Sequence, residues 1–151
     1  MEYIIKQQDK FRFVEEGQGE PLILLHGLFG AMSNFSDLIE YFRHHNKVVV
    51  PLLPLFDLDI LHTSVSGLER FVNRFIEARG YEDVHLLGNS LGGHVALLHI
   101  LKHPQKIKSL ILTGSSGLFE SGMGDSYPKR GDYEYIRRKT ELTFYDPQMA
   151  T

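Results

Sequence analysis

One short stretch of this sequence combines residue types that can perform covalent chemistry. Residues 88–92 are Gly-Asn-Ser-Leu-Gly, which is the pattern Gly-x-Ser-x-Gly. A serine hydroxyl becomes a nucleophile when an adjacent base takes its proton, and this pattern presents the serine on a sharp turn between a strand and a helix. An apolar strand pattern, Val84–Leu87, precedes the motif, and a helical pattern follows it without a break. The sequence therefore nominates Ser90 as a nucleophile that attacks a carbonyl carbon.

The neighbours of Ser90 are of the types that such a turn requires. Ser90 has to lie at the apex in a strained backbone conformation, so that its hydroxyl projects beyond the sheet. Larger side chains two positions away on either side would collide there, which accounts for Gly88 and Gly92. The start of the following helix directs backbone N–H groups at the reacting oxygen. The N–H of Leu91 is therefore the first expected oxyanion donor.

Two other interpretations of the motif are less well supported. Ser90 could serve only as the N-cap of the helix, but a strand and a helix flank the motif as a nucleophile turn requires. A dinucleotide site needs Gly-x-Gly-x-x-Gly after a strand and an acidic residue near the end of the next strand. The sequence has neither feature.

A second turn can supply the other oxyanion donor. Residues 26–30, His-Gly-Leu-Phe-Gly, directly follow a run of four apolar residues. A glycine-bounded turn here can aim a backbone N–H at the point that Leu91 addresses, and each such donor is worth roughly 3 kcal/mol to the transition state. We expect the N–H of Leu28, with that of Phe29 as the second choice. His26 could act as a base, but we expect a structural histidine that braces this turn through hydrogen bonds.

The order of elements around these turns is typical of a parallel sheet covered by helices on both faces. Two short strands, Tyr3–Lys6 and Phe11–Glu15, come first, around a polar turn at residues 7–10. Ser66 and Glu69 have the spacing of a capping box at the start of the second helix, and Gly80 is expected to end that helix in a left-handed conformation. The remaining predicted elements are strands at Leu22–Leu25, Val48–Val50, Val84–Leu87 and Ile107–Leu112, and helices at Asn34–Arg43 and Leu91–His103.

Composition and charge narrow the function classes. With 151 residues and 42% hydrophobic content, the chain can form one domain with a core. A net charge of −3 without a basic face argues against a nucleic-acid partner, and the lack of cysteine excludes disulfides, zinc–thiolate sites and a cysteine nucleophile. Residues 1–10 have neither the apolar core of a signal peptide nor that of a membrane span. We therefore expect a cytoplasmic protein that binds no membrane.

Taken together, the two turns, the helix ending at His103-Pro104 and the strand after it resemble the α/β-hydrolase superfamily. The resemblance covers residues 1–117 as the N-terminal part of the hydrolase core and makes residues 118–151 the start of a cap or lid insertion. It implies a serine hydrolase that acts on a carboxylic ester or related acyl substrate without a cofactor or metal. The site residues that it implies are Ser90 as nucleophile, Leu28 and Leu91 as the oxyanion hole, and His26, Gly27, Gly88 and Gly92 in support.

Two details of the resemblance leave the substrate class open. Residues 88–93, Gly-Asn-Ser-Leu-Gly-Gly, together with residues 115–118, Ser-Ser-Gly-Leu, are similar to the branch that hydrolyses carbon–carbon bonds in ring-cleavage products. Residues 26–30 are similar instead to small acyl-ester esterases. A non-catalytic binding module on the same fold is a third possibility.

The chain departs from the family in lacking the C-terminal strands that carry the triad acid and histidine. We therefore expect an incomplete hydrolase, a fragment with feeble or no activity of its own, which pairs through the apolar edge strand Ile107–Leu112 with a missing segment or with a copy of itself. His94, His99 and His103 follow Ser90 on one helix and are interpreted as a polar face, although the i, i+4 spacing of the last two could hold a metal. The apolar loop at residues 51–55 is expected to line the pocket.

Overall fold

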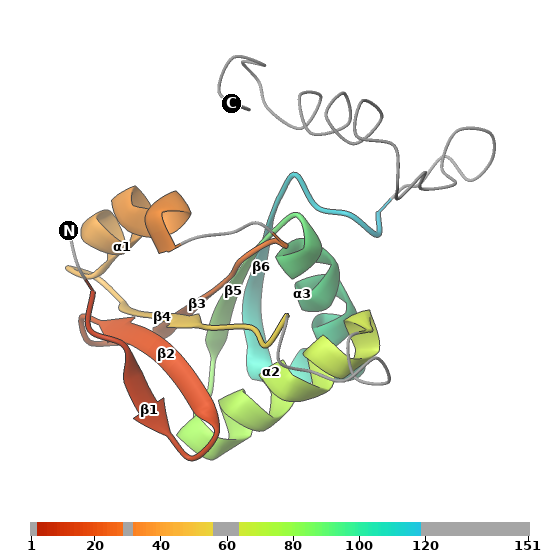
Figure 1. Cartoon of the computed structure of the whole chain (residues 1–151), viewed down its shortest axis with the longest axis horizontal. Helices are drawn as coiled ribbons and strands as arrows, with labels where there is room; N and C mark the ends of the chain where they lie inside the picture. The colour runs from red at the N-terminus through yellow and green to blue at the C-terminus, as the bar shows by residue number, and fades with distance from the viewer. Residues whose placement is uncertain (1–2, 29–31, 56–63, 119–151) are drawn as a thin grey trace. The chain divides into compact units, whose positions relative to one another are not determined.

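A six-stranded mixed sheet forms the centre of the described chain (Figure 1). The computed structural model describes residues 3–28, 32–55 and 64–118. The strand order is β1-β2-β4-β3-β5-β6; β1 and β2 run antiparallel to their neighbours, and β4, β3, β5 and β6 are parallel. The strands are β1 (Lys6–Gln8), β2 (Phe11–Glu16), β3 (Pro21–Leu25), β4 (Lys47–Pro51), β5 (Val84–Asn89) and β6 (Ile107–Thr113). This arrangement confirms the predicted mostly parallel sheet.

Helices cover both faces of the sheet, as Figure 1 shows. The helices are α1 (Ser36–Phe42), α2 (Val65–Arg79) and α3 (Leu91–Lys102), with 3-10 turns at Met32–Phe35 and Pro104–Lys106. One buried cluster joins the sheet to α2 and α3, and a second joins the opposite face to α1. All five residues of β3 are buried, because alternate side chains enter the two clusters. A strand buried on both faces explains the continuous apolar run in the sequence.

The first strand begins later than the sequence predicts. The prediction was Tyr3–Lys6, but β1 spans Lys6–Gln8 and the turn to β2 contracts to two residues, with Asp9 at φ 52°. Tyr3 is drawn away from the sheet edge because its ring packs against the α1 cluster and its hydroxyl donates to the Ser36 carbonyl at 3.3 Å.

The first helix also starts late, since Asn34 and Phe35 belong to the preceding 3-10 turn. The apolar stripe nevertheless lies against the sheet as predicted, with Phe35 and Ile39 buried.

The predicted capping box at Ser66 and Glu69 is wrong. The N-cap of α2 is Ser64, whose hydroxyl accepts from the Gly67 N–H at 3.1 Å. Glu69 does not turn back to the helix start, because its carboxylate is buried against α3. At the other end the prediction is confirmed, since Gly80 closes α2 in the left-handed region at φ 62° and ψ 31°.

The predicted polar face on α3 is wrong for His99, whose side chain is fully buried. Its Nδ1 lies 3.1 Å from the Glu69 carboxylate, so packing between α2 and α3, not solvent, surrounds this imidazole. The helix itself has the predicted extent, with His103 as its C-cap.

The strand β6 forms one edge of the sheet, since it pairs with β5 and with no other described strand. Ile111 is 43% exposed there. Association through this edge stays a prediction. The described residues all fall within one compact unit, Met1–Glu120, and the predicted cap at 118–151 lies outside the described residues except for Leu118. No helix in the described ranges combines the length and apolar character that crossing a membrane requires.

Candidate active site

Ser90 lies on the sharp bend between β5 and α3. Its backbone is at φ 53° and ψ −118°, a conformation that glycine adopts readily and L-residues rarely do. Hydrogen bonds hold it there, because its N–H donates to the Thr113 carbonyl at 3.0 Å and its own carbonyl accepts from Gly93 at 3.0 Å and His94 at 3.2 Å. The residue is exposed, and its hydroxyl makes no capping bond to the helix. This excludes the interpretation of Ser90 as a mere N-cap.

The two glycines that flank Ser90 allow three backbone segments to approach one another. A Cβ on Gly92 would collide with the carbonyl of Leu25, at the end of β3. A Cβ on Gly88 would lie only 2.5 Å from the Gly92 carbonyl oxygen. The start of α3 therefore sits directly over the carboxyl end of the sheet, and this contact places the bend beside the turn that follows β3.

That turn faces the Ser90 hydroxyl. A Cβ added to Gly27, which is itself buried, would lie 3.5 Å from Oγ and 3.1 Å from Cβ of Ser90. The absence of a side chain at position 27 leaves room between the turn and the hydroxyl. The segment His26–Leu28 is thus within reach of any group bonded to Oγ.

His26 braces this turn with both ring nitrogens. Its Nε2 accepts from the Leu53 N–H at 3.1 Å, so Nδ1 carries the proton and donates to the Gly27 carbonyl at 2.9 Å. In a trans peptide the C=O and the next N–H point in opposite directions. The bond to Gly27 therefore turns the N–H of Leu28 away from the imidazole. Because both nitrogens are engaged, His26 has the arrangement of a supporting residue and not of a base.

The side chains of Leu53 and Leu55, in the loop after β4, are buried in the core at 6% and 8% exposure. That this loop lines the pocket stays a prediction. The backbone of Leu53 is the part that matters to the site, since it fixes the tautomer of His26.

Two backbone donors remain available near Ser90. Leu91 is the first residue of α3, where the N–H has no partner within the helix. Neither the Leu91 N–H nor the Leu28 N–H bonds to another described residue. Phe29, the alternative donor, lies outside the described residues.

A family model described as alpha/beta hydrolase fold matches residues 20–142. The chain belongs to the α/β-hydrolase fold family. The matched range contains both turns and all of α3, so the bend at Ser90 is the family's strand–turn–helix in its expected place.

Individual relatives of this α/β-hydrolase chain are enzymes. Lipase 1 of Psychrobacter immobilis is 29% identical over 125 residues, covering 78% of this chain and 39% of the lipase. The 2-hydroxy-6-oxo-6-phenylhexa-2,4-dienoate hydrolase of Comamonas testosteroni is 30% identical over 156 residues, covering 91% and 54%. Among solved structures, MGS-MChE2, an alpha/beta hydrolase enzyme from lagoon sediments of Mar Chica, Morocco, is 47% identical with a TM-score of 0.74. The match covers 78% of this chain and 54% of that structure, so the chain spans 39–54% of the length of these three proteins.

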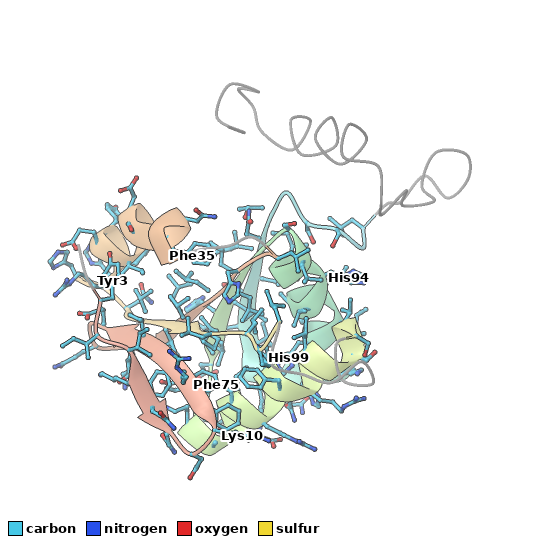
Figure 2. All side chains as sticks on the ribbon, in the orientation of Figure 1. Tyr3, Lys10, Phe35, Phe75, His94 and His99 are labelled. Atoms are coloured by element: carbon cyan, nitrogen blue, oxygen red, sulfur yellow. The ribbon has the colours of Figure 1, made fainter. Side chains whose placement is uncertain are left out.

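The described part of this α/β-hydrolase chain places no base on Ser90, whose hydroxyl forms no hydrogen bond there. His94, labelled in Figure 2 on the first turn of α3, packs instead against Gly117, where a Cβ would lie 2.5 Å from the ring. An imidazole does contact a serine hydroxyl elsewhere, because His85 Nδ1 lies 2.7 Å from Ser109 Oγ and its Nε2 lies 2.9 Å from Glu20. That chain of hydrogen bonds lies at the amino ends of β5 and β6, at the opposite end of the strands from Ser90.

Sequence reasoning missed the support that Ser90 receives from the segment after β6. Besides the bond to Thr113, the Ser116 N–H donates to the Ser90 carbonyl at 3.3 Å. Asn89 adds to this, since its side-chain amide donates to the Thr113 carbonyl at 3.2 Å and hydroxyl at 3.0 Å. The partners of Ser90 itself are backbone groups, which nearly every residue type carries, so no residue type marks them in the sequence.

Proposed function

We propose that this chain carries the nucleophile and both oxyanion-stabilising turns of a serine hydrolase that acts on a carboxylic ester or a related acyl substrate. The main support is the geometry at Ser90. The residue is held at φ 53° with an exposed hydroxyl, and the His26–Leu28 turn faces that hydroxyl across the gap left by Gly27. Backbone strain of this kind is concentrated at active sites, which supports a reacting group at the apex of the bend.

The reaction proceeds through an acyl-enzyme. A base from outside the described residues takes the proton of Ser90 Oγ, and Oγ bonds to the carbonyl carbon of the ester. The carbonyl electrons move to the oxygen, which accepts hydrogen bonds from the N–H groups of Leu91 and Leu28. Collapse of this intermediate expels the alkoxide, which takes the proton from the base. Water then attacks the acyl group by the same route, releasing the acid and restoring Ser90.

A second candidate is hydrolysis of an acyl carbon–carbon bond at the same serine. The similarity to the 2-hydroxy-6-oxo-6-phenylhexa-2,4-dienoate hydrolase extends over 91% of this chain, and residues 88–93 have the form of that branch. The similarity to a lipase favours the ester. Both candidates use the same nucleophile and the same two donors, so they differ in the leaving group.

The proposal is tested with a fluorophosphonate probe, which bonds covalently to activated serine hydroxyls, on folded protein that includes the segment supplying the base. We expect the label to map to Ser90 by mass spectrometry, to vanish in Ser90→Ala, and to persist in the matched variant Ser109→Ala. A folded protein that carries no label at Ser90 would favour a binding module instead. A panel of p-nitrophenyl esters and a conjugated diketone then separates the two substrate classes.

A further inference from the structure

A buried polar pair joins α2 to α3 at a distance from Ser90. Glu69 and His99 have side chains that are 1% and 0% exposed, and Oε1 of the first lies 3.1 Å from Nδ1 of the second. His99 follows Ser90 by nine residues, which is roughly 13 Å along a helix. Buried polar atoms are normally hydrogen-bonded, yet Nε2 of His99 has no partner in the described part of the chain. The nucleophile turn makes no use of this pair.

His103 adds a third potential ligand at the surface end of the pair. Its Nε2 lies 3.4 Å from Oε1 of Glu69, and its ring centroid lies 4.9 Å from that of His99. One ligand atom from each of the three residues lies within 4.8 Å of the other two. His103 is 30% exposed, whereas the other two are buried. Figure 2 shows where His99 lies in the fold.

The two separations from the Glu69 carboxylate fit the coordination sphere of a small transition-metal ion. Zinc binds imidazole nitrogen and carboxylate oxygen at about 2.0–2.2 Å, so neighbouring ligands of a tetrahedral site stand roughly 3.3–3.5 Å apart. The two separations from Oε1, 3.1 and 3.4 Å, are close to this spacing. Lys102 donates to the other oxygen of Glu69 at 2.7 Å. That bond orients the carboxylate so that Oε1 faces both imidazoles.

A metal-binding imidazole needs a free lone pair on its ligand nitrogen. In the described part of the chain, Nδ1 of His99 faces Oε1 of Glu69, and Nε2 of the same ring has no partner. Because Nε2 of His99 has no partner, the ring can carry its proton there and free Nδ1 without breaking a bond at Nε2.

We propose that Glu69, His99 and His103 bind one divalent transition-metal ion, with zinc as the expected occupant and water at the fourth position beside His103. Two imidazoles and one carboxylate form a donor set that suits zinc. The bound ion would join the N-terminal part of α2 to the C-terminal end of α3. The proposal goes beyond the hydrolase function and does not depend on it.

The test is zinc binding by the full chain after a chelator has been dialysed away. Titration calorimetry should give one site. Changing a group that orients a metal's ligands typically weakens metal binding by roughly 10–100-fold, so removing a ligand in His103→Ala should weaken zinc binding at least that much. His103 is partly exposed, so this variant should fold. The matched control replaces both His44 and His45, exposed histidines beyond α1, by alanine and should retain the site.

Two further measurements decide the outcome. Cobalt(II) should give the intense visible bands of four-coordination in the wild type and lose them in Glu69→Gln. Zinc should raise the unfolding temperature of the wild type but not of His103→Ala. Equal zinc affinity in His103→Ala and the wild type, or loss of binding in the His44/His45 control, would overturn the proposal.

Discussion

The strained bend at Ser90 predicts an unusual response to a glycine substitution. We expect Ser90→Gly to be more stable than Ser90→Ala, although glycine normally lowers stability. The backbone at this position, φ 53° and ψ −118°, lies in a region that a Cβ makes costly and that glycine reaches freely. Alanine retains the Cβ and therefore the strain, whereas glycine relieves it. Both variants lose the hydroxyl, so that loss cancels when the two are compared.

The size of the effect follows from two opposing contributions. Strain at a sparsely populated backbone conformation costs about 1–3 kcal/mol, and the extra chain entropy of glycine costs about 0.5–1 kcal/mol. The free energy of unfolding of Ser90→Gly should therefore exceed that of Ser90→Ala by about 1 kcal/mol, within a range of roughly 0 to 2.5 kcal/mol. With a urea dependence of about 1–3 kcal/mol per molar, 1 kcal/mol moves the midpoint by roughly 0.3–1 M, which is readily measured.

A control in β6 separates strain from entropy. Ser109 lies in an ordinary strand, so Ser109→Gly should be less stable than Ser109→Ala by the entropic cost alone. Both variants lose the bond to His85 equally. Subtracting the second difference from the first cancels the entropy and leaves the strain at position 90, about 1–3 kcal/mol. If the two pairs gave the same difference, position 90 would carry no strain and the argument for a strained nucleophile would fail.

Three further predictions concern the surroundings of the bend and the acid stability of the fold. Gly92→Ala should lower the free energy of unfolding by about 3 kcal/mol, because the added Cβ meets the Leu25 carbonyl. Gly80→Ala should lower it by only about 1 kcal/mol, because the added Cβ meets nothing within 4 Å and the cost comes from the positive φ alone. If thermal melts gave similar losses for both variants, the close approach of Gly92 to the end of β3 would be contradicted. His26→Ala should slow fluorophosphonate labelling of the nucleophile, because the Gly27–Leu28 peptide loses its brace, and an unchanged labelling rate would remove this role. Burial would raise the pKa of Glu15, but hydrogen bonds from tyrosine, lysine and arginine partners lower it from 4.5 to about 2. Because the pKa is lower in the folded protein than in the unfolded one, the ionised carboxylate stabilises the fold by about 3 kcal/mol above pH 4.5. This stabilisation is lost as the pH falls toward 2. Acid denaturation of Glu15→Gln should lack that component, and an unchanged acid profile would count against the network.

The nucleophile bend and the sheet could be predicted from the sequence because local sterics encode them. Only small residues fit at positions 88 and 92, and the continuous apolar run at Leu22–Leu25 is typical of a strand buried on both faces. The helix end at Gly80 is equally local, since the left-handed conformation favours glycine. In each of these cases the residue type and its immediate neighbours determine the backbone.

Tertiary structure decided the features that depend on partners far along the chain. The burial of Glu69 depends on His99, thirty residues away, because a buried carboxylate must find its partners in three dimensions. The tautomer of His26 depends on the backbone of Leu53, twenty-seven residues on. The residue types determine where the chain bends. The packing of α3 against the sheet and against α2 determines which polar groups face one another.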